Sequence, residues 1–148
     1  MGAYIHKFLG IELNGLTWNL LEKENRSPED EYRLINAAHA SLYHWSEIGE
    51  PVNIQRGEWL ISHAYAVIGM ADFAIFHAEK CMEITRENDI GDFDLAFAYE
   101  ALTRAYAAKS NRDKYNEFLK LAEVAGNKIV EEEDIQIFME TLRSCKFE

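Results

Sequence analysis

Apolar residues recur at intervals of three and four along most of the chain, and no stretch alternates convincingly between apolar and polar positions. Near the start of the chain the apolar positions are Ile5, Phe8, Leu9, Leu13, Leu16, Leu20 and Leu21. Because an α-helix turns once every 3.6 residues, this spacing predicts helices with one apolar face. Gly10 and Gly15 interrupt the first of them, and glycine weakens a helix interior, so a break there is possible.

Turn and capping residues divide this pattern into seven helices joined by short loops. Ser27 predicts the start of the second helix, because a serine side chain caps the free N–H groups of a helix N-terminus. We expect Asn53 to cap the third helix in the same way, and Asp92 or Asp94 to cap the fifth. Gly69 predicts a tight turn between the third and fourth helices. The predicted helices span about 3–23, 28–47, 54–68, 71–87, 93–109, 112–126 and 130–144.

Two stretches of the chain carry the same pattern of residues. Tyr65 corresponds to Tyr106, and this pair sets the interval between the two stretches. The other equivalent pairs are Ile61 with Leu102, Ala64 with Ala105, Gly69 with Ser110, and Cys81 with Ala122. We therefore expect residues 54–87 and 93–126 to form two similar antiparallel hairpins of helices.

The first helix of each unit resembles the tetratricopeptide repeat family, whose pattern is W-x2-L-G-x2-Y over a period of about 34 residues. The matching stretches are Tyr99-x2-Leu102-Thr103-x2-Tyr106 and Glu58-x2-Ile61-Ser62-x2-Tyr65, with Trp59 one place late. The interval from Tyr65 to Tyr106 is longer than that period, and the family's terminal proline is missing. The phrases AAHASLYHW and IGDFDLAFAYEA are also similar to uncharacterised bacterial proteins of this type, which implies no activity.

This resemblance implies a fold and a domain organisation. The fold is an all-α, right-handed solenoid of about seven helices, stacked as antiparallel hairpins in a single domain over residues 1–148. Residues 3–47 would form a divergent first hairpin. Residues 130–144 would form a capping helix, which a stack of repeats needs because its last apolar face is otherwise open.

The resemblance also implies a concave groove along the first, third, fifth and seventh helices, which binds an extended peptide. The groove positions that it implies are Arg56, Trp59, His63 and Val67 on the third helix, with Phe97, Glu100, Arg104 and Ala108 on the fifth. Aromatic and arginine side chains dominate binding hot spots, and two arginines suit a carboxylate such as a peptide C-terminus. The alternative is that Trp59 and Phe97 only pack between hairpins and that the charges are solvated.

Composition narrows the classes of partner. The 148 residues carry a formal net charge of −11, so the chain lacks the basic surface that nucleic acids and anionic membranes require. Acidity favours a basic protein or peptide as partner, and it also keeps a protein soluble. Cys81 and Cys145 form no CxxC motif, which suits a reducing compartment. Because neither a signal-peptide pattern nor a long apolar run is present, we expect a cytoplasmic protein.

Five histidines raise the question of metal binding or catalysis. His39 and His44 are five residues apart, about 140° around a helix, so they face different ways and do not chelate one ion. His77 precedes Cys81 by four residues, but Cys81 falls where the repeat has a small buried residue. The sequence contains no metal-binding or catalytic motif of known spacing, so we expect no metal, no cofactor and no catalysis.

The histidines of the second helix differ in the partners that they have nearby. His39 shares a face with Asn36 and Tyr43, which are within one helical turn. His44 has only Ser41 within that range. Because a buried ring nitrogen needs a hydrogen-bond partner, His44 is the histidine whose partner matters most.

Two alternatives from other classes stay open. A small-molecule or metal-dependent enzyme would need several polar side chains to converge in one pocket, namely His39, His44, His63, His77 and Glu100. A homodimer would use exposed aromatic surface such as Phe8 and Trp18 as its interface. A stoichiometric transition metal found by elemental analysis would favour the metal-dependent enzyme. Light scattering at two protein concentrations would test the homodimer.

Overall fold

The computed structural model describes residues 2–147, and within them it contains seven α-helices and no strand. The helices are α1 (Ala3–Glu22), α2 (Pro28–Ile48), α3 (Pro51–Val67), α4 (Ala71–Glu87), α5 (Asp92–Lys109), α6 (Arg112–Asn127) and α7 (Glu132–Arg143). The all-α class predicted from the sequence is therefore confirmed. The largest error in the predicted boundaries lies at the start of α3, which begins three residues before the expected position.

The start of α2 is capped as the sequence predicts. The Ser27 hydroxyl accepts a hydrogen bond from the backbone N–H of Asp30 at 3.1 Å, and the Asp30 carboxylate accepts one from the Ser27 N–H at 3.0 Å. This reciprocal pair is a capping box. Lys23 also donates to the Asp30 carboxylate at 2.8 Å. The hydrogen bonds from Lys23 and Ser27 lower the pKa of Asp30 to about 2.

The caps expected at α3 and α5 are wrong. Pro51 occupies the first turn of α3, so Glu50 is the N-cap residue and Asn53 lies inside the helix. Gly91 is the N-cap residue of α5, and no side chain caps that helix. The Asp92 carboxylate instead accepts a hydrogen bond from the backbone N–H of Val130 at 3.0 Å, which ties the start of α5 to the loop before α7.

The first helix runs through both of its glycines without a break. Gly10 lies against the indole ring of Trp45 on α2, and a Cβ added to Gly10 would come within 2.9 Å of that ring. The Ser41 hydroxyl donates to the Gly10 carbonyl at 2.8 Å. The glycine therefore allows α1 and α2 to approach closely, because only a residue without a side chain fits under the indole ring.

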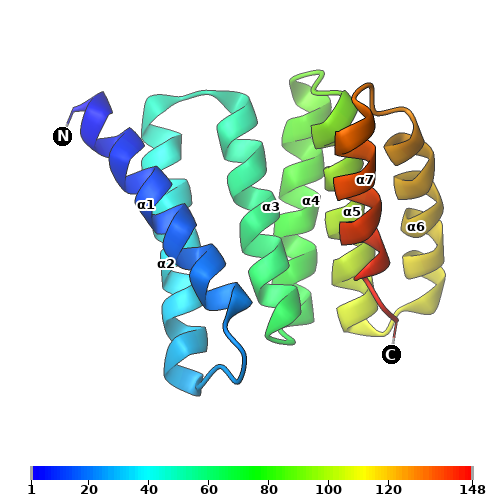
Figure 1. Cartoon of the computed structure of the whole chain (residues 1–148), viewed down its shortest axis with the longest axis horizontal. Helices are drawn as coiled ribbons and strands as arrows, with labels where there is room; N and C mark the ends of the chain where they lie inside the picture. The colour runs from blue at the N-terminus through cyan, green and yellow to red at the C-terminus, as the bar shows by residue number, and fades with distance from the viewer. Residues whose placement is uncertain (1, 148) are drawn as a thin grey trace.

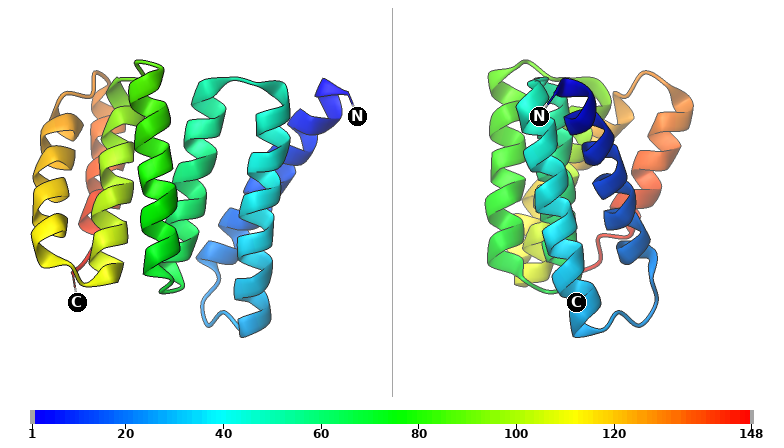
Figure 2. Two further views of the ribbon diagram at one scale, coloured as in Figure 1. Left: turned by 180° about the vertical axis from the view of Figure 1, so that it is seen from behind. Right: turned by 90° about the vertical axis from the view of Figure 1, so that its left-hand side faces the viewer.

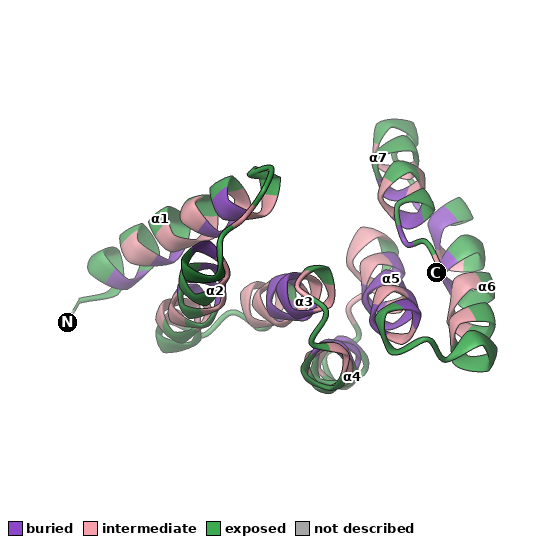
Figure 3. Cartoon of the chain, turned by 90° about the horizontal axis from the view of Figure 1, so that it is seen from below, coloured by how far each residue is buried: buried purple, intermediate pink, exposed green. Residues whose placement is uncertain are grey.

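Consecutive helices pack as three antiparallel hairpins, α1 with α2, α3 with α4 and α5 with α6, which stand side by side (Figures 1 and 2). The hairpins contact one another through α2 and α3, α4 and α5, and α3 and α5. The last helix packs against both α5 and α6. Seen along the helices in Figure 3, α1 and α7 project to the same side of α3 and α5. The odd-numbered helices thus share one face of the molecule.

Small and medium-sized apolar residues fill the core between the hairpins. The larger cluster joins α2, α3, α4 and α5 and includes Ala38, Ile61, Ala78 and Leu102. A second cluster joins α5, α6 and α7 around the fully buried ring of Phe138. The predicted small, buried position at Cys81 is confirmed, since its side chain is fully buried. Burial raises the pKa of the Cys81 thiol, so it stays protonated.

The second and third hairpins repeat each other in detail. The Tyr65 ring stacks on His77, with ring centroids 5.6 Å apart and an interplanar angle of 14°. The Tyr106 ring stacks on Phe118 with centroids 5.7 Å apart and an angle of 10°. The number of residues from His77 to Phe118 is the same as that from Tyr65 to Tyr106. The two ring stacks are therefore formed by residues at equivalent positions of the two repeated stretches.

The turns of these two hairpins are equivalent as well. Gly69 and Ser110 both have positive φ, at 84° and 62°, and both lie in the turn that follows the first helix of their hairpin. The next residues, Met70 and Asn111, each donate a backbone N–H to the carbonyl of the equivalent tyrosine, at 2.9 and 3.1 Å. The predicted correspondence between Gly69 and Ser110 is thus a correspondence of backbone conformation.

Candidate binding groove

A groove runs across the face that the odd-numbered helices share. Its larger part is a cavity of about 500 Å³ between α1, α3, α5 and α7. Its smaller part, of about 300 Å³, continues between α1, α2 and α3 and shares Asn14, Arg56 and Leu60 with the cavity. We call the two parts together the concave groove. The predicted groove residues Arg56, Trp59, His63 and Phe97 all line the larger cavity.

Aromatic rings form much of the cavity wall. Trp18 of α1 stacks with Trp59 of α3 at a centroid distance of 6.0 Å, and Trp59 stacks with His63 at 4.9 Å. Phe97 of α5 meets Trp59 edge to face at 5.6 Å. Trp59 and Phe97 therefore pack against neighbours and line the cavity at the same time. The sequence indicates Trp18 only as part of a dimer interface, because its place in the groove depends on how α1 crosses α3.

Glu100 lies under this wall rather than in the groove, so the prediction that it is a groove residue is wrong. Its carboxylate is fully buried and accepts three hydrogen bonds. The donors are Trp59 Nε1 at 2.7 Å, Arg104 Nε at 2.8 Å and Cys145 Sγ at 3.1 Å. Burial beside this carboxylate raises the pKa of the Cys145 thiol. Glu100 thus holds α3, α5 and the end of the chain together.

Arg104 is also turned inward, which contradicts its predicted role in gripping a ligand carboxylate. Besides Glu100, it donates through Nη2 to the Thr141 carbonyl at 3.1 Å and to the Ser144 hydroxyl at 2.8 Å. Its side chain is only 13% exposed. The last turn of a helix carries free carbonyl groups that attract a cation, and α7 supplies such a turn here. The hydrogen bonds of this arginine are therefore made to the chain's own C-terminal segment.

Arg56 stands at the rim of the cavity with its charge compensated. Its guanidinium makes two hydrogen bonds to the Asp94 carboxylate, at 2.9 and 3.0 Å. These bonds raise the pKa of Arg56. Beneath them, Gln55 donates to the Thr85 hydroxyl and to the Asp94 carbonyl, both at 3.0 Å. The predicted pair of groove arginines thus presents no free cation to a ligand in this structure.

His63 is a polar side chain of the cavity wall with a buried ring nitrogen that lacks a partner. Its Nδ1 atom is shielded from solvent and makes no hydrogen bond within residues 2–147. Burial lowers the pKa of His63 to about 4, and the positive charge of Arg104 acts in the same direction. The ring is therefore neutral at pH 7. Val67 and Ala108, predicted with it, border a separate hollow of about 350 Å³.

His39 and His77 lie together on another part of the surface. His39 Nε2 and the Tyr65 hydroxyl are 2.9 Å apart, and His77 Nδ1 lies 2.6 Å from the Glu58 carboxylate. Burial and the nearby His77 lower the pKa of His39. The partner of His39 therefore comes from α3, and not from its own helical turn as expected.

The partner of His44 is His6 of α1, and their Nδ1 atoms are 3.0 Å apart. Ser41, the partner expected within one turn, bonds to α1 backbone instead. The histidines thus occupy three separate places: His6 with His44, His39 with His77, and His63 in the groove. They do not converge with Glu100 in one pocket, which contradicts the arrangement that the enzyme alternative requires.

The two aromatic residues of the dimer alternative do not form one surface. Phe8 is 51% exposed on the outer side of α1, near the exposed side chains of Tyr4 and Ile11. Trp18 is partly buried and lines the concave groove. Phe8 and Trp18 therefore lie in different surroundings on α1.

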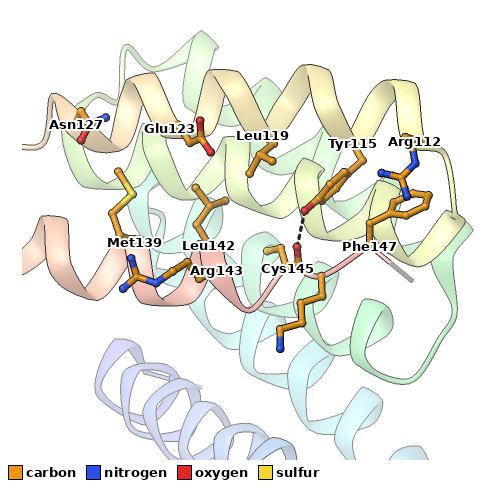
Figure 4. A pocket seen from close by; sticks show the side chains of 11 residues that line it. Arg112, Tyr115, Leu119, Glu123, Asn127, Met139, Leu142, Arg143, Cys145 and Phe147 are labelled. Atoms are coloured by element: carbon orange, nitrogen blue, oxygen red, sulfur yellow. Dashed lines mark hydrogen bonds between the residues drawn. The ribbon is translucent and has the colours of Figure 1, made fainter.

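Another hollow, of about 810 Å³, lies between α6, α7 and the C-terminal segment and contains no predicted site residue (Figure 4). Along it, the Tyr115 hydroxyl donates to the Cys145 carbonyl at 2.9 Å. The Arg112 guanidinium lies 3.9 Å from the centroid of the Phe147 ring. These contacts hold the C-terminal segment against α6, so the hollow borders a structural contact.

Within residues 2–147, no three or more His, Cys, Asp or Glu side chains are grouped in a way that could hold a metal ion. None of the helices in that part of the chain has both the length and the apolar character needed to cross a membrane. Comparison of the chain with protein-family models, with curated proteins and with solved structures finds no match. The concave groove is therefore the feature of the molecule from which a function can be inferred.

Proposed function

We propose that this protein is a binding module of the tetratricopeptide-repeat type, and that its concave groove binds an extended segment of a partner protein. Two observations support the repeat assignment. The second and third hairpins share their ring stacks and their turn geometry at one constant interval along the chain. The odd-numbered helices also lie on one face, as the first helices of a right-handed solenoid of such repeats do.

The observation that carries the binding proposal is the aromatic cavity itself. Trp18, Trp59 and Phe97 come from three different helices and surround a space of about 500 Å³. Buried aromatic side chains around a pocket are the usual anchors of binding energy. The space is large enough for a big apolar or aromatic side chain of a partner. The adjoining smaller part extends the groove, which favours an extended segment over a compact small molecule.

The charge of this protein indicates which residues of the partner should flank the side chain that enters the cavity. The chain has a net charge of −11, and the arginines at the groove are paired with Asp94 and Glu100. Glu133 is exposed on α7 and lies four residues before Ile137, which lines the cavity, so it shares that helix face. A peptide with basic residues around an aromatic residue therefore fits the groove best.

The cavity favours binding over catalysis. Its titratable side chains are Arg56 and Asp94, which neutralise each other, and His63, which is neutral at pH 7. A nucleophile next to a base, the usual sign of covalent catalysis, is missing from the residues that line it. We accordingly propose no reaction at this site.

The test is a titration of the protein with a lysine-rich peptide that has a central phenylalanine, and with the same peptide carrying alanine there. Tryptophan fluorescence reports binding directly, because Trp18 and Trp59 line the cavity. We expect saturable binding of the phenylalanine peptide and at least tenfold weaker binding of the alanine peptide. Trp18→Ala and Ile137→Ala should each weaken the first interaction at least threefold, since both remove apolar contact area.

Tyr32→Ala is the matched control, because Tyr32 is a 68% exposed aromatic residue that lines neither part of the groove. Circular dichroism checks that each variant is folded. The proposal is wrong if the phenylalanine peptide does not bind, or if Tyr32→Ala weakens binding as much as Trp18→Ala does. Trp59 and Arg104 are unsuitable first variants, because both also support the buried Glu100 carboxylate.

A further inference from the structure

Two histidines meet near the start of α1 and the end of α2, outside the concave groove. The Nδ1 atoms of His6 and His44 point at each other across 3.0 Å. Their ring centroids are 5.2 Å apart and their planes are inclined by 42°. His6 is only 8% exposed, whereas His44 is partly exposed to solvent. When both rings are neutral, one Nδ1–H donates to the lone pair of the other Nδ1.

This separation matches two nitrogen ligands of one metal ion. Bonds from imidazole nitrogen to Zn²⁺ or a similar ion are about 2.05 Å long, so nitrogens 3.0 Å apart subtend about 94° at the metal. An angle near 90° is that between neighbouring ligands in tetragonal and octahedral complexes, the geometries preferred by Cu²⁺ and Ni²⁺. A tetrahedral ion would need the nitrogens to move apart by about 0.3 Å.

We propose that His6 and His44 form a two-histidine site for a divalent ion of the Cu²⁺ and Ni²⁺ class. Both rings bind as neutral ligands, and the proton shared between the two Nδ1 atoms is replaced by the metal. The ring that carried this proton becomes the Nε2–H tautomer, so binding of the ion to the neutral pair releases no net proton. Because no third His, Cys, Asp or Glu side chain joins them within residues 2–147, water completes the coordination.

The other histidines lack this arrangement. His77 Nδ1 is engaged with Glu58, and His39 Nε2 with the Tyr65 hydroxyl. The rings of His39 and His77 meet edge to face, with centroids 5.3 Å apart. His63 stacks on Trp59 and meets Trp18 at a tilt, without a second histidine beside it. His6 and His44 are therefore the histidine pair whose ring nitrogens already lie within chelating distance, and each ring has to turn its lone pair from the N···N line towards the ion.

Metal binding would add a coordinate link between two helices that already meet by packing and by the hydrogen bond from Ser41 to the Gly10 carbonyl. The backbone of α1 packs mainly against α2. His6 belongs to α1 and His44 belongs to α2, so an ion between them joins the two helices. Because α1 also carries Trp18 and Asn14 of the concave groove, the bound ion would hold one wall of the groove in place.

The test is calorimetric titration of the tag-free full-length protein with Ni²⁺, together with electron paramagnetic resonance of the Cu²⁺ form. We expect one ion per chain and a Cu²⁺ spectrum with splitting from two nitrogens. His44→Asn should weaken Ni²⁺ binding at least tenfold, because the asparagine amide still hydrogen-bonds to His6 but is a poor ligand. His39→Asn is the matched control and should leave the affinity within twofold.

Two results would overturn the site. One is the absence of stoichiometric Ni²⁺ binding to a folded protein. The other is equal weakening by His44→Asn and His39→Asn, which would indicate nonspecific binding by surface histidines. Nuclear magnetic resonance of the ¹⁵N-labelled rings provides an independent readout, since Ni²⁺ at this site should perturb the signals of His6 and His44 before those of His39 and His77.

Discussion

The position of His63 in the cavity wall can be predicted from the sequence, but the ionisation of its ring cannot. Its spacing from Trp59 places it on the groove face, and in the structure it lines the cavity. Its ionisation depends on burial and on Arg104, which belongs to α5 and is distant in the chain. The Nδ1 atom is left without a hydrogen bond, a cost that proteins seldom tolerate except where a ligand or water can bind.

The lowered pKa of His63 makes the stability of the protein pH-dependent. The pKa is about 4 in the folded chain against an ordinary value of 6.5, so the unfolded chain binds more protons between these values. This contribution to stability is therefore fully present above pH 6.5 and is lost as the pH falls towards 4. It amounts to at most about 3 kcal/mol.

Urea unfolding of the wild type and of His63→Phe at several pH values measures this contribution. Phenylalanine keeps an aromatic ring in the wall but does not titrate. We expect the free energy of unfolding of His63→Phe to fall less between pH 7 and pH 4 than that of the wild type. Equal losses in the two proteins would show that His63 is not a source of the pH dependence.

Glu100 and Arg104 show the limit of prediction at the same scale. A helical stripe tells which residues share a face, and by that criterion both belong with Phe97. It does not tell which part of the stripe another element will cover. The end of α7 and Cys145 cover Glu100 and Arg104, while Phe97 stays in the cavity wall. The difference arises from contacts between residues that are far apart in the chain.

At the scale of elements, capping residues and prolines near the N-terminus of α2 and of α3 set the residue at which each helix begins. Ser27 and Asp30 exchange hydrogen bonds across three residues, and this pattern is visible in the sequence. Pro51 sets the start of α3 although Asn53 has the better capping side chain. Proline prevails because it lacks an N–H and its fixed φ suits the first turn. The Asn53 side chain therefore has no helix N-terminus to cap.

Removing the Ser27 cap by Ser27→Ala should destabilise the protein by about 1 kcal/mol, because one N–H at the start of α2 loses its acceptor. Ser27→Asp should restore most of that loss, since aspartate is an equally good cap. Glu50→Ala is the control, because the Glu50 side chain makes no cap hydrogen bond. Thermal unfolding of the wild type and these variants measures the effect, and an equal loss in Glu50→Ala would contradict the assignment of the cap.

At the scale of the whole molecule, the hairpins stand in a row and each contacts only its neighbours. The central helices α3 and α5 are covered on both sides, whereas α1 packs mainly on α2 at one end. The other end is protected by α7, which buries Phe138 and Leu142 against α5 and α6. In a row of this kind, stability depends on contacts between neighbours, so the end with fewer contacts should open first.

Hydrogen exchange followed by mass spectrometry tests this order of opening. We expect backbone amides in the middle of α1 to exchange at least tenfold faster than those in the middle of α3 and α5. The α6 helix, which is covered by α7, should be intermediate. If α1 proved as protected as α5, the molecule would behave as one cooperative unit rather than as a row of hairpins.

The sequence by itself determined the class, the number and the approximate bounds of the helices, and the interval from Tyr65 to Tyr106. These features depend on periodicity and on interactions within a few residues, so they can be read locally. Only the tertiary structure decided that Glu100 is buried and that Trp18 joins the groove. It also decided that His44 meets His6. Each depends on where two helices cross, which is set by packing between residues distant in the chain.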